Sequence, residues 1–198
     1  MRYFLTVLLL CLFSSCKSKV DYLKSELRSE NGYFQAVIEI PAGTNSKIEY
    51  DKVDRIFKPS LRDGKERTID FLAYPANYGF IPSTFSNPEK GGDGDALDVM
   101  VLSSTIPSGK IVEIIPIGMI KLMDAGEQDF KVIAIPADKG LRTISAENFK
   151  DFVKKYEPAK NILESWFLNY DPADDTKIQG WADEKETEQE ILRLHGEL

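Results

Sequence analysis

The sequence predicts a mainly β fold of the α+β class, in which a small closed barrel is covered on its outside by helices near the C-terminus. Two observations lead to this prediction. Between residues 33 and 135, short apolar segments alternate with clusters of Gly, Pro, Asn and Asp, which is typical of barrels with many short strands. After residue 145, apolar residues recur at the spacing of a helix. The 198 residues, 42% of them hydrophobic, suffice for one sizeable core in one domain.

Six strands are expected in the first part of the domain, and each is an apolar or alternating run bounded by turn formers. They are residues 33–40, 47–50, 68–72, 98–102, 111–120 and 130–135. Short strands joined by connections of varied length favour a small closed barrel.

Two helical patterns follow the strands. The first comprises Phe149, Phe152, Val153 and Tyr156, with Ser145 as a candidate N-cap, and the second comprises Ile162, Leu163, Trp166, Phe167 and Tyr170. We expect these helices to pack on the outside of the barrel, with Trp166 and Phe167 in the core rather than in contact with a ligand.

The N-terminus carries a predicted export signal over residues 1–15, in which Arg2 is followed by an apolar run and then by small residues. The apolar run is shorter than the ~20 residues of a membrane-spanning helix. The Leu-Phe-Ser-Ser-Cys segment that ends at Cys16 resembles a bacterial lipobox, whose cysteine is lipidated and becomes the new N-terminus. The alternative is a plain secretory signal with an incidental cysteine.

The lipobox implies a mature protein that is exported and anchored by lipid on the periplasmic or cell-surface side of a bacterial membrane. Residues 16–31 are polar, and we expect them to form the lipidated N-terminus and a tether, with a short helix over 21–28. The domain is expected over residues 32–198. Since Cys11 leaves with the signal and Cys16 carries lipid, this domain contains no thiol and no disulfide.

The charge balance is acidic, with 32 Asp and Glu against 25 Lys and Arg and a net charge of -7. No basic stripe is present to bind a phosphate backbone, so we expect no nucleic-acid partner. An acidic chain can still bind a phosphate compound if metal ions lie between the two.

The segment GGDGDALDVM, residues 91–100, places the carboxylates of Asp93, Asp95 and Asp98 within six residues. Carboxylates this close repel one another unless cations bind them, so we interpret the segment as a metal site rather than a solvated loop. A helix-loop-helix calcium site is excluded by spacing, because Leu97 stands where a third ligand is required. All-oxygen ligation favours magnesium or manganese over zinc.

Further acidic residues lie near predicted strand ends. Asp124 and Asp129 flank a second turn between two apolar segments, and Glu39 ends the first predicted strand. Lys47 and Glu49 share one face of the next strand, because strand side chains alternate with a period of two.

Four segments together resemble the soluble family I inorganic pyrophosphatases. They are EIPAGTNSKIE at 39–49, YPANYGFIP at 74–82, DGDALDV at 93–99 and DAGEQDFK at 124–131, and they occur in the order of the family. The resemblance implies a five-stranded OB-type barrel flanked by C-terminal helices, the last over 186–195. It also implies several magnesium ions, with manganese as an alternative, and hydrolysis of pyrophosphate to two orthophosphates.

The resemblance also assigns roles to individual residues. The metal ions are bound by Asp93, Asp98, Asp124 and Asp129, with Asp95 as the general base that accepts a proton from the attacking water. Glu39 and Glu49 act through water or an additional metal ion. The phosphate oxygens are bound by Lys47, Arg67, Tyr78, Lys131 and Tyr170.

Two positions depart from the family pattern. Ala125 stands where many members have an acid, and Asp171 stands where the family has a lysine after the site tyrosine. If Asp171 faces the site, it repels the substrate, and Lys177 is then a candidate for the missing cation.

The function predicted is therefore metal-dependent pyrophosphate hydrolysis by a homo-oligomer. The alternatives are an exported lipoprotein that binds divalent metal or phosphate without catalysis, and an OB-type interaction module. Asp95 favours the enzyme, since a binding module has no need of a base beside its metal ligands.

Overall fold

The computed structural model describes residues 19–171, 173 and 175–197, and its centre is a closed circuit of strands. The strands are β1 (Phe34–Ile40), β6 (Asn77–Phe80), β7 (Asp98–Val101), β8 (Ile111–Asp124) and β10 (Lys131–Pro136). Each pairs with the next in the order β1-β6-β7-β10-β8, and β8 pairs again with β1. Only the β7–β10 pairing within this circuit is parallel. The circuit therefore has no unpaired edge among these strands.

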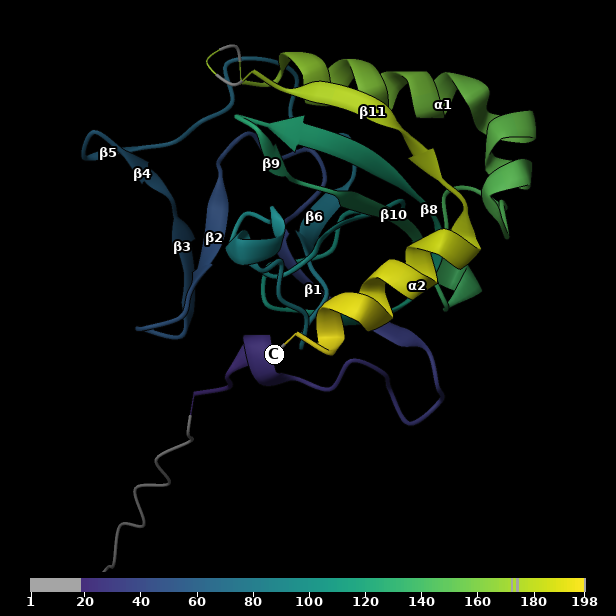
Figure 1. Ribbon diagram of the computed structural model, residues 1–198, viewed down its shortest axis with the longest axis horizontal. Helices are drawn as coiled ribbons and strands as arrows, with labels where there is room; N and C mark the ends of the chain where they lie inside the picture. Colours follow the sequence, from purple (N-terminus) through teal and green to yellow (C-terminus); the bar gives the residue numbers. More distant parts are fainter. Residues whose placement is uncertain (1–18, 172, 174, 198) are drawn as a thin grey trace, which may run out of the picture.

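The remaining elements surround this circuit (Figure 1). They are β2 (Ile48–Asp51), β3 (Ile56–Pro59), β4 (Leu61–Arg62), β5 (Lys65–Glu66), β9 (Glu127–Gln128), β11 (Lys177–Ala182), α1 (Phe149–Asn169), α2 (Glu184–His195) and the short 3-10 helices η1 (Tyr22–Lys24), η2 (Pro88–Lys90) and η3 (Lys139–Leu141). β9 and β11 pair with β8, and α1 and α2 both contact β8 and β11. The hairpins β2–β3 and β4–β5 stand to one side of the circuit.

The strands have a hydrophobic cluster on each face. In β10, Val132 and Ala134 join the cluster that includes Ile191 of α2, whereas Ile133 belongs to the cluster that includes Phe152 of α1. Every residue of β10 is buried, because both faces of the strand are covered. The prediction of a mainly β fold with C-terminal helices is confirmed, and the assignment to the OB type stays a prediction.

Every predicted strand except 68–72 is found, within four residues at its ends. In that segment only Thr68 makes a β-bridge, and Leu72 instead accepts a hydrogen bond from the indole of Trp166 at 2.9 Å. The sequence analysis also missed β6, because it contains no β-branched residue and carries Gly79.

The two helical patterns belong to one kinked helix, α1, whose backbone is non-helical at Tyr156. Pro158 explains the kink, since its ring cannot fit against the carbonyl four residues earlier. The N-cap is Asn148, which accepts a hydrogen bond from the Asp151 amide at 2.8 Å. Ser145, expected to cap the helix, instead bonds the hydroxyl of Tyr156. Trp166 and Phe167 are in the core, as predicted.

The predicted signal peptide and the lipidation site Cys16 lie outside the described residues. Residues 19–31, expected to form a tether, lie against the domain: Leu27 joins the core, and the Tyr22 ring packs 5.0 Å from that of Phe57. The expected helix over 21–28 is only the short η1. Within the described chain, no helix has the length and hydrophobicity to cross a membrane.

Gly79 gives a test of the barrel, because the backbone of β1 approaches it closely. A Cβ at this position would lie 1.9 Å from the carbonyl oxygen of Val37. We expect Gly79→Ala to lower the free energy of unfolding, measured by urea denaturation, by about 2 kcal/mol or more. As a control, Gly196→Ala places its Cβ 3.5 Å or more from other atoms and should change stability by less than about 0.5 kcal/mol. Equal effects would contradict the strand register.

Candidate active site

A pocket of about 550 Å³ lies between the barrel and the two hairpins. It is lined by every residue to which the sequence analysis gave a metal-binding, catalytic or substrate-binding role: Glu39, Lys47, Glu49, Arg67, Tyr78, Asp93, Asp95, Asp98, Asp124, Asp129, Lys131 and Tyr170. The predicted residues are therefore brought together, although they come from distant parts of the chain.

The two acidic turns are fixed to each other and to the 86–92 segment by backbone hydrogen bonds. The Ser86 amide donates to the Asp95 carbonyl at 2.8 Å, and the Gly94 amide donates to the Ser86 carbonyl at 2.8 Å. The Gln128 amide of the second turn donates to the Gly91 carbonyl at 2.7 Å. The Asp93 carboxylate accepts from the Asp95 amide at 3.1 Å. These bonds, most of them between backbone groups, hold the two acidic turns in place.

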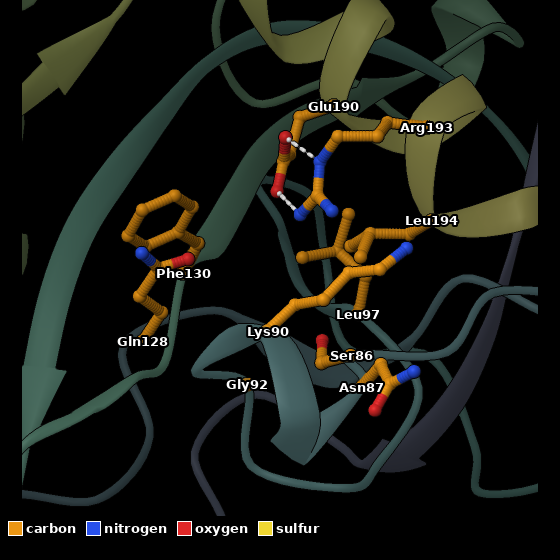
Figure 2. Close-up of a pocket in the computed structure, with 10 residues that line it drawn as sticks. All are labelled: Ser86, Asn87, Lys90, Gly92, Leu97, Gln128, Phe130, Glu190, Arg193 and Leu194. Carbon is orange, nitrogen blue, oxygen red and sulfur yellow. Dashed lines mark hydrogen bonds and ion pairs between the residues drawn. The ribbon is translucent and has the colours of Figure 1, made fainter. Parts of the chain in front are cut away.

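A small hollow lies behind the first acidic turn, next to α2 (Figure 2). Its volume of about 10 Å³ admits no more than a single water molecule. Figure 2 shows the Arg193 guanidinium donating twice to the carboxylate of Glu190, at 2.9 and 2.6 Å. Leu194 and Leu97 lie beneath this ion pair. The acidic turn and α2 thus lie close together here, and the hollow between them is too small for a substrate.

Lys131 lies between two carboxylates at the base of the pocket. The parallel register of β7 and β10 pairs it with Asp98, and its ammonium donates to both Asp98 and Asp129. The Tyr78 hydroxyl donates to the same Asp98 carboxylate at 2.6 Å. Burial alone would lower the pKa of Lys131, but the two carboxylates hold its pKa well above the ordinary value. Lys131 is therefore charged at neutral pH.

Burial raises the pKa of three acids in the pocket, Glu39, Asp93 and Asp98. Burial raises the pKa of Glu39 from 4.5 to about 8, although the Tyr50 amide donates to its carboxylate at 2.7 Å. Burial also raises the pKa of Asp93 to about 6, and the charges of Asp98 and Asp129 add to this effect. At neutral pH, Glu39 therefore keeps its proton when no cation is bound, and a cation that binds these carboxyl groups would favour their ionised form.

The donor set fits a hard divalent cation, because the lining acids offer only oxygen ligands. Among residues 19–171, 173 and 175–197, no three acidic, histidine or cysteine side chains are grouped closely enough to enclose an ion by themselves. A cation here would need water and substrate oxygens to complete its coordination. Magnesium behaves in this way, since it keeps several waters and binds through few carboxylates.

The hairpin side of the pocket carries cations. The Lys47 amide donates to the Arg67 carbonyl at 2.9 Å, the Arg67 amide donates to Ser60 at 2.8 Å, and the Ser60 amide donates to Lys47 at 2.8 Å. This triangle of backbone bonds keeps Lys47 and Arg67 adjacent. The assignment of Arg67 to the pocket is thus consistent with the structure, whereas Lys65 lies outside its lining.

Some lining residues were not predicted from the sequence, notably Lys52, Arg62 and Glu127. The Lys52 ammonium lies 3.8 Å from the Asp95 carboxylate. The only signal for Arg62 was its place in a cluster of cations around Gly64, which is equally typical of a surface hairpin. No local pattern identified these residues.

The expectations for Asp171 and Lys177 need correction. The Asp171 carboxylate lies 2.8 Å from Arg62 and 3.3 Å from Arg67, so its charge is paired with two guanidinium groups. Lys177 pairs with Asp175 at 2.7 Å and is not part of the pocket lining. Lys177 therefore does not replace the family lysine in this structure.

The family model for inorganic pyrophosphatase matches residues 36–198. The chain belongs to the inorganic pyrophosphatase family. It is 37% identical over 166 residues to the inorganic pyrophosphatase of Saccharolobus solfataricus, covering 79% of this chain and 86% of that protein. The relative from Sulfolobus acidocaldarius is 34% identical over 165 residues, covering 78% of this chain and 85% of that protein.

The fold is also similar to solved inorganic pyrophosphatases. The crystal structure of the Thermus thermophilus enzyme superposes with a TM-score of 0.76 at 27% identity, covering 90% of this chain and 98% of that chain.

The raised pKa values of this pyrophosphatase-family chain predict a pH-dependent stability. Without divalent cations, folded Glu39 keeps its proton above the ordinary pKa of 4.5, so the free energy of unfolding should fall as pH rises toward about 8. Magnesium binding to the acids should oppose this fall. We therefore expect magnesium to raise the melting temperature more at about pH 8 than at about pH 5.

Thermal denaturation in chelator and in magnesium, at both pH values, measures this effect. Glu39→Gln should flatten the pH dependence in chelator, because the substituted amide cannot titrate. Glu188→Gln changes an acid outside the pocket lining and serves as the control. Equal stabilisation by magnesium at the two pH values would contradict the prediction.

Proposed function

We propose that this chain hydrolyses inorganic pyrophosphate to two orthophosphates. The observation that carries the proposal is one pocket of about 550 Å³ whose lining brings carboxylates together with lysines, arginines and tyrosines. A small, highly charged phosphate compound suits this arrangement, because its oxygens can bind metal ions on one side and ammonium or guanidinium groups on the other. The relatives, which are named inorganic pyrophosphatases, support the same substrate.

The cofactor proposed is magnesium, with manganese as an alternative, bound by Asp93, Asp98, Asp124 and Asp129. When bound, such ions would neutralise phosphate charge and lower the pKa of the attacking water. Glu39 and Glu49 would orient water or contact an additional ion. The oxygen ligands offered by the lining carboxylates support this assignment.

Asp95 is proposed as the general base. Its side chain is 76% exposed, and its position is fixed by the backbone bonds of the acidic turn. It can therefore accept a proton from a water in the pocket without first breaking a buried ion pair. The alternative, a metal- or phosphate-binding protein without catalysis, is not favoured, since it leaves the place of Asp95 unexplained.

The other predicted residues bind and orient the phosphates. Lys47, Arg67 and Lys131 would contribute charge, and Tyr78 and Tyr170 would contribute hydroxyl groups. Tyr78 already donates to Asp98 at 2.6 Å, and Lys131 donates to the same carboxylate, so a phosphate contacting them is held beside the acids. Such positioning of the substrate beside the catalytic groups would favour the reaction.

We also propose that the protein is exported, carries lipid on Cys16 and works as a homo-oligomer at a bacterial membrane surface. The lipobox-like segment supports the lipid anchor. The first described residue, Lys19, lies three positions after Cys16. The domain would thus be held close to the membrane.

Phosphate release by purified residues 17–198 tests the enzymatic function. We expect hydrolysis of pyrophosphate that requires a divalent cation and is lost in excess chelator. Asp95→Asn should lower kcat by about 10² to 10⁴, the usual contribution of a positioned base. Asp175→Asn, which removes an exposed acid outside the pocket lining, is the matched control and should leave kcat unchanged. Undiminished turnover in chelator, or in Asp95→Asn, would contradict the mechanism.

Fractionation of cells that express the full chain tests the anchor. Cys16→Ser should move the protein from the membrane to the soluble fraction, because it removes the site of lipid attachment. Ser15→Ala, a change next to the cysteine, should leave the protein in the membrane fraction. If the serine variant still sediments with membranes after a high-salt wash, the anchor is not a lipid on Cys16.

A further inference from the structure

Asp171 occupies a position where an acid is unfavourable by itself. It directly follows Tyr170, the C-cap of α1, and the C-terminal end of a helix carries partial negative charge. Its side chain is only 11% exposed, so water solvates the carboxylate poorly. A charge in this position needs a cationic partner within the protein.

Arg62 and Arg67 supply that partner. Two guanidinium nitrogens of Arg62 lie 2.8 and 3.4 Å from the two carboxylate oxygens of Asp171, and one nitrogen of Arg67 lies at 3.3 Å. The hydrogen bond from Arg62 is the main reason that the pKa of Asp171 lies below its ordinary value. The forked contact fixes the plane of the Arg62 guanidinium as well as its position.

The β4–β5 hairpin brings Arg62 to this place. Arg62 pairs with Lys65 across a two-residue turn, in which Asp63 and Gly64 have φ angles of 54° and 75°. An Asp-Gly turn of this type matches the natural twist of a hairpin. The backbone bonds of Ser60 and Arg67 then join the hairpin to Lys47.

Arg62 and Arg67 line a different set of cavities from Asp171. Arg62 and Arg67 line both the main pocket and an adjoining hollow of about 380 Å³, whereas Asp171 lines only the adjoining hollow. Asp171 therefore lies behind the two guanidinium groups relative to the main pocket. The three side chains carry a net charge of about +1, and both positively charged residues line the main pocket.

We propose that Arg62 is a further phosphate-binding residue and that Asp171 is the positioning residue that holds Arg62 and Arg67 side by side. This inference rests on the proposed function, since it concerns the phosphate wall of the same pocket. Two adjacent guanidinium groups repel each other, and the carboxylate between them removes that repulsion. Arg62 thereby supplies a cation in the region where the family has a lysine after the site tyrosine.

Steady-state kinetics with magnesium pyrophosphate tests the inference. Arg62→Gln should raise KM about tenfold and change kcat less than about threefold, since a bound phosphate loses one charged partner. Asp171→Asn should raise KM about fivefold, and Asp171→Lys should raise it further, because a third cation drives the arginines apart. A fall in KM for Asp171→Lys would mean that Asp171 acts by repelling substrate, and would overturn the proposal.

Lys65→Gln is the matched control, because it removes the same charge from the same hairpin at a residue that lines only the adjoining hollow. Its KM should stay within about twofold of the parent value. Asp171→Glu keeps the charge and should recover part of the affinity lost in Asp171→Asn. In the Arg62→Gln background, Asp171→Asn should raise KM much less than in the parent. Fully independent effects would overturn the positioning role.

Binding of inorganic phosphate in the presence of magnesium, measured by calorimetry, separates this inference from the proposed function. A parent protein that does not hydrolyse pyrophosphate would overturn the proposed function. Weaker phosphate binding by Arg62→Gln than by the parent and by Lys65→Gln would still support the role of Arg62. Equal binding by all three proteins would overturn it, whatever the turnover.

Discussion

The pocket depends on the ammonium of Lys131, which lies between the carboxylates of Asp98 and Asp129. The parallel register of β7 and β10 sets Lys131 opposite Asp98, and Asp129 lies two positions earlier on the same side. Without this cation, two poorly solvated carboxylates would repel each other across the strand pair. Tyr78 adds a bond from β6 to the same Asp98 carboxylate. The chemistry of the pocket is thus tied to the closure of the barrel.

A column of aromatic rings connects the same region to α1. The ring centroids of Tyr78 and Tyr74 lie 5.4 Å apart, those of Tyr74 and Trp166 lie 4.7 Å apart, and Tyr170 stacks on Trp166 at 4.6 Å. Aromatic rings bury large apolar surfaces and have few rotatable bonds, so their packing fixes the relative positions of the segments that carry them. The end of α1 is therefore placed relative to the barrel by this column, and both Tyr170 and Asp171 reach the pocket region because of it.

The acidic residues of the pocket were easier to predict from the sequence than its cations, for a physical reason. Asp93, Asp95 and Asp98 lie within six residues, so a local pattern reveals them. Asp171 lies 109 residues from Arg62, and no local pattern can pair them. The same limit explains why β6 was missed, since a strand that contains Gly79 is stabilised by its neighbours rather than by its own propensity.

The acids of the pocket and the cations on its hairpin side also differ in how far their side chains can be substituted or moved. The acids project from barrel strands and from turns whose backbones bond one another, so a shift in one carboxylate displaces the others. Lys131 also belongs to a barrel strand, whereas the other lining cations, Lys47, Lys52, Arg62 and Arg67, come from the hairpins or from residues beside them. On the hairpin side, the two-residue turn of β4–β5 places Arg62 next to Asp171, which stands where the family pattern has a lysine. Arg62 and Arg67 together outweigh the charge of Asp171, so this side of the pocket stays positive. The charge of Asp171 is compensated by arginines on the hairpin side of the pocket, so the ion pairs of Lys131 with Asp98 and Asp129 are left unchanged.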